Sequence, residues 1–509
     1  MNAKRPVACG LGVALTAIGL ATLMPAKPVA ARPESSAVRE ATSEEVNRLC
    51  GACHAYPPPN TFPRSAWRKE VKQGYDFFHA DLAYRFDYPP LESVVRYYES
   101  RAPESLPLLS QSAAPNPPLA RFEKSGYSAV DGGTPGVAHV SIVRLFRKDK
   151  ADILVCDAVN NQVLVYSPYE SPPVWKVIAR GLCCAHAEVV DLDGDGIADV
   201  VLACLGNFYA TDDRVGSVVW LRGRADGTFA PVTLLDGIGR VADVRAADFT
   251  GSGKFDLVVA EFGWHKAGSI QLLENRTTDW TTPTFVPRTL DGRHGTTHVP
   301  VADLNGDGKP DFVAVISQEH ESVVAFLNEG GGRFRKETIY AAPHPTYGCN
   351  GVQLVDLDGD GKLDVLLSNG DSLDPPYLLR PDHGVTWLRN RGTYPFEANR
   401  LADCYGAGSP VAADFDGNGL LDVAFVTFLP GEFFPQRSPM KLDSLVLLEQ
   451  VKPGQFTRHS LELQACDHLS CAAGDIDGNG RPSLVVGSYF RAGRKADALT
   501  IWRNLAERR

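Results

Sequence analysis

The residues with the clearest chemistry near the start of the chain are the five of Cys50–His54, which read Cys-Gly-Ala-Cys-His. Two thiols at this spacing can reach the two vinyl groups of one porphyrin, and the adjacent imidazole can then coordinate the iron. Cys50, Cys53 and His54 therefore predict one covalently attached haem c. Two alternatives are a redox disulfide between the two cysteines and half of a zinc site. The first normally follows a strand, and the second needs another cysteine pair nearby, whereas the next cysteine is Cys156.

The sixth ligand of such a haem is left open by the sequence. The methionines are Met1, Met24 and Met440, and none of them lies near the motif. His79 is the only other histidine between residues 40 and 105, which makes it the candidate ligand, with a lysine, a tyrosine or an open position as alternatives. A haem with two histidine ligands would have a lower potential than one with histidine and methionine.

A second chemical pattern is a nine-residue segment that occurs six times, starting at residues 191, 248, 303, 356, 414 and 475. Oxygen-bearing side chains occupy positions 1, 3, 5 and 9, and glycines at positions 4 and 6 permit the positive φ angles of a tight turn. With a backbone carbonyl at position 7, these are the hard oxygen ligands that Ca²⁺ prefers. The predicted ligands are Asp191, Asp193, Asp195, Asp199, Asp303, Asn305, Asp307, Asp311, Asp356, Asp358, Asp360, Asp364, Asp414, Asp416, Asn418, Asp422, Asp475, Asp477 and Asn479.

The six copies differ in how completely they match the ligand pattern. Those at 191, 303, 356 and 414 have a full ligand set, and the copy at 475 has Ser483 at its last position. The copy at 248 has Thr250 and Ser252 at positions 3 and 5 and is expected to be the weakest or empty. We expect about four or five Ca²⁺ ions in a structural role; the alternative is a set of Asp/Gly turns without metal.

The segments around these loops predict the elements that position them. A short segment enters each loop, an apolar run such as Asp311-Phe-Val-Ala leaves it, and two further strands follow, the last with a recurring phenylalanine. Four strands in each repeat of 53 to 61 residues are typical of a propeller blade. The last repeat lacks a fourth strand, and Arg121–Lys124 resembles the missing one. We therefore expect seven blades, counting a degenerate first copy that contains Asp152, in a ring closed by pairing the two ends of the chain.

These motifs resemble two known families. The loop repeats are similar to the FG-GAP/VCBS repeats of integrin α-chains and of exported bacterial proteins, which implies a calcium-bearing β-propeller over residues 120–509. Residues 40–105 resemble a small c-type cytochrome domain. The expected fold is mainly β, with a leader over 1–31, a small α-helical haem domain over 32–105, a Pro-rich linker over 106–119, and the seven-bladed propeller.

One face of the propeller is the candidate working face. His139, His186 and His298 each lie five residues before the first position of their repeat, which places them at the starts of innermost strands. Trp264, His265, His320, Asp371 and Asp374 fall in connections between second and third strands, on the same face. The histidines could bind a metal or an anion or approach a haem, and the alternative is a hydrogen-bonded channel lining.

Eight of the eleven cysteines fall in the propeller, near the starts of first strands or the ends of second strands. An oxidising compartment would favour disulfides, which we expect to tie neighbouring blades. Cys466 with Cys471 or with Cys404 is a reasonable pairing, and a bridge between Cys183 and Cys184 is an alternative.

The compartment is indicated by the first residues. Lys4 and Arg5 precede an apolar run from Val7 to Met24, and small residues at Val29 and Ala31 suit cleavage by a signal peptidase, with an uncleaved anchor as the alternative. After cleavage no apolar stretch is long enough to span a bilayer. The net charge of −10 and the absence of a basic block beyond the N-terminus argue against a nucleic-acid partner. We expect a bacterial periplasmic, secreted or cell-surface protein.

Three functions agree with these features. The first is electron transfer by the haem, coupled to a redox partner protein or a small ligand bound on the propeller. The second is calcium-dependent adhesion, with a glycan or a protein as ligand. The third is a propeller oxidoreductase that passes electrons to the haem. No catalytic triad or phosphate-binding loop is apparent in the sequence, and the catalytic residues are unknown.

Overall fold

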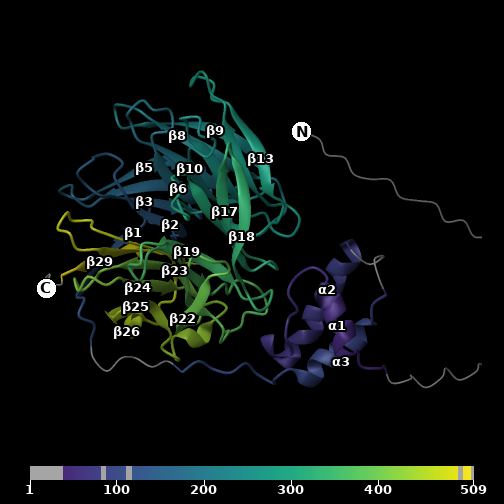
Figure 1. Ribbon diagram of the computed structural model, residues 1–509. Helices are drawn as coiled ribbons and strands as arrows, with labels where there is room; N and C mark the ends of the chain where they lie inside the picture. Colours follow the sequence, from purple (N-terminus) through teal and green to yellow (C-terminus); the bar gives the residue numbers. More distant parts are fainter. Residues whose placement is uncertain (1–37, 82–86, 111–116, 491–496, 506–509) are drawn as a thin grey trace, which may run out of the picture.

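In the computed structural model, residues 38–81, 87–110, 117–490 and 497–505 are described, and they form a helical unit and a β-propeller (Figure 1). The expected leader, residues 1–31, lies outside them. Within this described part of the chain, no helix has the length and apolar character needed to cross a membrane.

The helical unit comprises three α-helices in its described residues. They are α1 (Ser43–Cys50), α2 (Trp67–Asp81) and α3 (Leu91–Arg101), with short 3₁₀ turns at Pro59–Thr61 and Arg64–Ala66. The start of α1 is a capping box, because the Glu45 amide donates to Thr42 Oγ1 at 3.2 Å and the Thr42 amide donates to Glu45 Oε2 at 2.8 Å.

The core of this unit is aromatic. The apolar face of α2 is buried against α3, and the rings of Trp67 and Tyr98 stack with centroids 3.8 Å apart. Full burial of one such side chain stabilises the fold by about 1.5–3 kcal/mol.

The propeller has seven blades, each a four-stranded antiparallel sheet with one further short strand in the fourth blade. The strands of the first four blades are β2 (Val137–Val143), β3 (Asp152–Asp157), β4 (Gln162–Ser167) and β5 (Val174–Arg180); β6 (Cys184–Val190), β7 (Asp199–Cys204), β8 (Gly216–Gly223) and β9 (Phe229–Ile238); β10 (Val241–Ala247), β11 (Asp256–Glu261), β12 (Ser269–Asn275) and β13 (Phe285–Asp291); and β14 (Thr296–His298), β15 (Val301–Ala302), β16 (Asp311–Ile316), β17 (Ser322–Gly330) and β18 (Arg333–Ala341).

The last three blades follow the same order. Their strands are β19 (Cys349–Val355), β20 (Asp364–Asn369), β21 (Gly384–Arg389) and β22 (Glu397–Asp403); β23 (Ala407–Ala413), β24 (Asp422–Thr427), β25 (Asp443–Lys452) and β26 (Gln455–Leu463), with a 3₁₀ turn at Pro435–Arg437; and β27 (His468–Gly474), β28 (Ser483–Ser488), β29 (Asp497–Asn504) and β1 (Phe122–Ser128). Every second strand is buried along its whole length, as the apolar runs predicted.

The predicted ring closure is confirmed. β1 pairs antiparallel with β29, from Phe122 opposite Asn504 to Ser128 opposite Asp497, and so supplies the fourth strand of the last blade. The innermost strand of this blade, β27, packs against β2 of the first blade. Seven blades thus close without an exposed sheet edge between the first and the last.

The expectation of disulfides between blades is wrong. The eight cysteines of the propeller are thiols, and all are buried. Cys404 packs in the apolar layer between the fifth and sixth blades, while the Cys466 thiol lies 3.3 Å from the Asp443 carbonyl oxygen of its own blade. These side chains behave as small apolar residues of the core.

One pair of thiols within a blade is nevertheless close enough to react. Cys184 on β6 lies opposite Cys204 on β7, and their sulfur atoms are 2.6 Å apart. In an oxidising compartment we expect this pair to form a disulfide, which would stabilise the fold by about 3 kcal/mol.

Alkylation under denaturing, non-reducing conditions, followed by mass spectrometry, measures this outcome. The exported protein should carry a Cys184–Cys204 cross-link and two fewer alkyl groups than the reduced protein. Cys204→Ser should abolish the cross-link, and Cys471→Ser should leave it intact. Complete alkylation of both Cys184 and Cys204 would refute the prediction.

Candidate functional site

The six Asp/Gly loops lie between first and second strands and share one face of the propeller, called here the loop face. The carboxylate at position 1 folds back over its loop: Asp303 accepts from the amides of Gly306 and Gly308, each at 2.8 Å. Asp356, Asp414 and Asp475 accept amides in the same way. Positive φ angles at both glycines of the pattern allow this bend, as at Gly306 and Gly308.

In three loops, three of the predicted ligands come together. Oxygen atoms of each set lie within 4.8 Å of one another, and the sets are Asp191 with Asp193 and Asp199, Asp356 with Asp358 and Asp360, and Asp414 with Asp416 and Asp422. Asp195 and Asp364 do not join the groups of their own loops. In the loop at 303, Asn305 accepts from the Asp307 amide at 2.9 Å, and Asp307 forms an ion pair with Lys309. In the loop at 475, Asp477 pairs with Arg503, and Asn479 accepts from the Arg481 amide.

The aspartate at position 9 has a second role that the sequence did not reveal. It is fully buried at the start of the second strand, and its two oxygens accept one amide from the loop and one from the end of the third strand. Asp311, for example, accepts from Leu304 at 3.0 Å and from Asn328 at 2.6 Å. Ser483 accepts the corresponding Asn504 amide with its hydroxyl. Position 9 therefore joins three segments of a blade with or without a metal.

A recurring basic residue was also missed. Arg222 at the end of β8 forms an ion pair with Asp193 at 2.6 Å, and Arg389 at the end of β21 does the same with Asp358. Both follow a Trp-Leu pair and lie over the tryptophan ring two residues earlier. The repeated Trp-Leu-Arg in the sequence would have indicated this ion pair. It neutralises the carboxylate at position 3 of these two loops.

The Cys50–His54 motif straddles the end of α1. Cys50 is the last helical residue and packs against the aromatic core, Cys53 is exposed, and His54 is partly exposed. A Cβ atom on Gly51 would lie 2.5 Å from the Asn47 carbonyl oxygen, so this position of the motif requires glycine. The two thiols and the imidazole thus follow one helix end, with the cysteine nearer the core and the other two groups accessible to solvent.

His79, the candidate sixth ligand, is exposed near the end of α2. Its Nε2 atom lies 3.0 Å from the Tyr88 hydroxyl, and its ring touches those of Tyr75 and Phe78. Residues 82–86, which follow α2, lie outside the described part of the chain. In this arrangement His79 is engaged by the aromatic residues around it.

The histidines predicted at the starts of innermost strands do come together. The rings of His139 and His186 are 4.3 Å apart, and Asp243 lies 3.0 Å from His186 Nδ1 and 4.0 Å from His298 Nδ1. Arg245 also pairs with Asp243. Burial raises the pKa of Asp243. The nearby Arg245 and His186 have the opposite and larger effect, and together they hold this pKa well below its usual range. Charge pairs on Asp243 and the contact between the two histidine rings hold this cluster together.

The helical unit packs against the face opposite the loops, called here the histidine face (Figure 1). Phe77 of α2 contacts the His265 ring at 4.9 Å between centroids, and the Arg380 guanidinium lies over the Phe62 ring at 5.1 Å. Leu378 joins the aromatic core of the helical unit. Farther along, the Leu109 amide donates to the Tyr405 hydroxyl at 2.6 Å. The motif-bearing unit and the histidine face therefore form one packed assembly.

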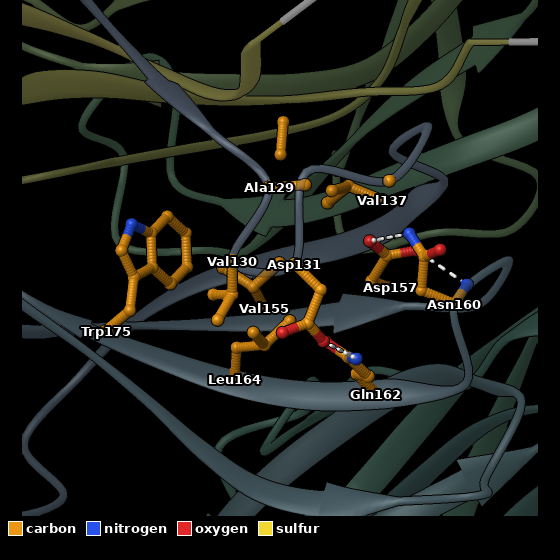
Figure 2. Close-up of a pocket in the computed structure, with 12 residues that line it drawn as sticks. Ala129, Val130, Asp131, Val137, Val155, Asp157, Asn160, Gln162, Leu164 and Trp175 are labelled. Carbon is orange, nitrogen blue, oxygen red and sulfur yellow. Dashed lines mark hydrogen bonds between the residues drawn. The ribbon is translucent and has the colours of Figure 1, made fainter.

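One enclosed cavity lies under the turn between β1 and β2 (Figure 2). Its volume is about 20 Å³, which is room for about one water molecule. Its polar side chains are already bonded to one another: Gln162 donates to Asp131 at 2.8 Å, and Asn160 donates to Asp157 at 2.7 Å. This cavity is part of the seam between the last and first blades and is too small for an organic ligand.

Comparisons with known proteins gave one family match and two similar crystal structures. The family model described as FG-GAP-like repeat matches residues 191–259 and 303–367. A comparison with curated proteins gave no match. Two crystal structures titled BBS1N in complex with ARL6DN, soaked with mercury and with lead, are similar at TM-scores of 0.45 and 0.44 and 10% identity. The similarity covers 76% and 77% of this chain and 97% and 99% of those chains. The strand topology gives a seven-bladed β-propeller, and the family match shows that it contains FG-GAP-like repeats.

Proposed function

We propose that this FG-GAP propeller protein is an exported electron-transfer protein whose helical unit carries one covalent haem c. The observation that carries the proposal is the packing of the Cys50–His54 unit on the histidine face through Phe77, Leu378 and Arg380. A redox group on this unit would lie on the same body as any partner or small ligand bound at that face.

The residues present fit a haem. Cys50 and Cys53 would hold the porphyrin through thioether bonds, and His54 would coordinate the iron. When bound, the haem supplies one-electron transfer. The aromatic residues around Cys50 provide an apolar, low-dielectric wall, and burial there raises the pKa of the Cys50 thiol. His79 stays a proposed sixth ligand, for which it would have to leave the Tyr88 hydroxyl.

The loop face would bind about four or five Ca²⁺ ions in this proposal, at the loops starting at 191, 303, 356, 414 and 475. Support comes from the carboxylates that crowd together in these loops, because a bound cation would reduce their mutual repulsion. Burial and the neighbouring Asp416 and Glu449 carboxylates raise the pKa of Asp422 to about 7. A divalent cation would neutralise such a group, and its role would be to hold the turn between two strands.

A redox titration of the exported holoprotein tests the proposed function. We expect the haem to be reduced and reoxidised reversibly in a one-electron step and to be reoxidised rapidly by small redox proteins. Cys471→Ser, a substitution buried in the propeller, is the matched control and should titrate like the wild type. A haem that is bound but cannot be cycled, or that no redox protein reoxidises, would rule out electron transfer.

A second function, calcium-dependent binding of a glycan or a protein, is favoured by one observation. A shallow groove of about 460 Å³ on the loop face is lined by Asp195, Arg222, Arg224 and Trp280. Binding to a glycan array that is unchanged in Cys50→Ser and lost on calcium removal would favour this alternative. Reduction of the haem by a small substrate without added reductant would instead favour a propeller oxidoreductase.

A further inference from the structure

Three metal-ligating side chains meet on the histidine face, away from the calcium loops and the Asp243 network. His294 comes from the connection between β13 and β14, and Glu319 and His320 come from the connection between β16 and β17. One ligand atom of each lies within 4.8 Å of the others. His294 Nε2 is 3.0 Å from Glu319 Oε2, and the two imidazole rings are 5.2 Å apart. All three side chains are partly exposed, so an ion could reach them.

The backbone fixes the first of these groups. Gly295, next to His294, has φ = 85°, and its amide donates to the Phe262 carbonyl at 2.8 Å while its carbonyl accepts from Ser317 at 2.8 Å. A Cβ atom at Gly295 would lie 2.8 Å from the Ser317 carbonyl oxygen. The segment carrying His294 is therefore pinned to the segment carrying the other two ligands.

The second segment is held in a conformation that costs energy. Gln318 and Glu321, which flank Glu319 and His320, have φ angles of 57° and 35°. Residues other than glycine rarely adopt this region, because it is sterically strained for them. The buried Glu321 carboxylate anchors the loop by accepting the Cys349 amide at 2.8 Å. The loop thus presents Glu319 and His320 side by side in a fixed arrangement.

The charges suit a divalent cation. Glu319 supplies one acidic oxygen ligand, and His294 and His320 supply two imidazole nitrogens. The neighbouring Arg293 is turned away and bonds Asp291 at 2.9 Å. One carboxylate and two imidazoles are ligands that first-row transition metals prefer over Ca²⁺.

We propose that His294, Glu319 and His320 bind one divalent transition-metal ion, of which Zn²⁺ is the test case, with coordination positions left for water or an external ligand. The hydrogen bond between His294 Nε2 and Glu319 would give way to two bonds to the ion. A proton on Nε2 would move to Nδ1 if the imidazole is neutral, or to solvent if it is an imidazolium. The site adjoins His265, on which Phe77 of the helical unit rests. A ligand on this ion would therefore touch the region where the two parts of the protein meet.

Titration calorimetry with Zn²⁺ tests the site, using tag-free full-length protein in millimolar calcium so that the Asp/Gly loops are saturated. We expect one equivalent to bind. Glu319→Gln and His320→Ala should each weaken binding by at least about tenfold, since even the loss of groups that merely orient ligands costs about 10–100-fold. His344→Ala is the matched control, because His344 pairs with Asp382 at 3.0 Å and belongs to another blade.

Unchanged affinity in both ligand variants, or the absence of a stoichiometric site, would overturn the proposal. Each variant is first shown to keep the wild-type melting temperature in calcium, and Glu319→Gln retains a side chain of the same size and hydrogen-bonding capacity. Failure of Zn²⁺ binding would leave the haem spectrum unaffected. If no haem is attached, Cys50, Cys53 and His54 could also bind Zn²⁺. The titration is then made in the Cys50→Ser/Cys53→Ser background, where only the equivalent lost in Glu319→Gln and His320→Ala belongs to the proposed site.

Discussion

A Cys50→Ser variant, exported from a host with c-type haem maturation machinery, should lose the normal two-bond haem attachment and the spectrum of the wild type. The reduced wild-type protein is expected to show a sharp α-band at the c-type position, and haem should remain on the chain after denaturation. The reason is chemical: a serine hydroxyl cannot form the thioether that a cysteine thiol forms with a vinyl group. The effect should be the largest of any single substitution in the helical unit.

Two further variants separate chemistry from folding. Cys53 is exposed and outside the aromatic core, so Cys53→Ser should leave the three helices intact while removing one of the two attachment points. The double variant Cys50→Ser/Cys53→Ser should carry no covalent haem. His54→Ala should keep the attachment and change the spectrum, because it removes the axial ligand rather than the thioethers. A wild-type protein without an α-band, or a double variant with one, would contradict haem attachment.

Removal of calcium should lower the melting temperature of the propeller by on the order of 10 °C. A site occupied at about 100 times its dissociation constant contributes about 2.7 kcal/mol to stability, and several such sites act together. Each kcal/mol corresponds to about 2–4 °C in a domain of 150–250 residues and to less in a larger one. Melting curves in calcium and in excess chelator measure the difference.

The chain provides its own matched control for this experiment. Asp303→Asn changes position 1 of a full loop, and Asp248→Asn changes the same position of the copy with Thr250 and Ser252. Both aspartates accept loop amides, Asp303 from Gly308 and Asp248 from Gly253, each at 2.8 Å, so the two changes disturb the backbone equally. Only Asp303→Asn should reduce the calcium-dependent shift, by a few degrees. Equal shifts in both variants, or none in the wild type, would mean that the loops are turns without metal.

Periodicity made most of the fold predictable. A loop pattern repeating every 53 to 61 residues, with a buried run behind it, specifies a blade, and the lone segment at Phe122 could complete only the blade that lacked a strand. The positions of His139, His186 and His298 followed from the same register. The network they form did not, because Asp243 and Arg245 stand in only one of the seven blades and have no repeating signal.

Where the predictions from the sequence were wrong or incomplete, the sequence lacked information on where side chains pack and which connections lie side by side. The cysteines were counted correctly, but their number does not show that Cys404 packs in an apolar layer and that Cys466 lies against a backbone carbonyl of its own blade. The docking of the helical unit depends on one exposed phenylalanine, Phe77, and on the long connection that contains Leu378 and Arg380, neither of which has a periodic signature. His294 and Glu319 are 25 residues apart and meet only because a fourth-to-first connection lies beside a second-to-third connection of the next blade.

The pairing of β1 with β29 has a consequence for the order in which the protein is made. Phe122–Ser128 emerges from the ribosome, and crosses any export channel, before all other strands, yet its partner is synthesised last. Six blades can form as they appear, but the seventh is incomplete until Asp497–Asn504 arrives. During that interval both strands have unpaired backbone edges, which are sites for aggregation and for capture by chaperones. A chain interrupted within its last blade would therefore be unable to close the ring. The pairing of these two strands alone distinguishes a finished molecule from an unfinished one for chaperones and proteases.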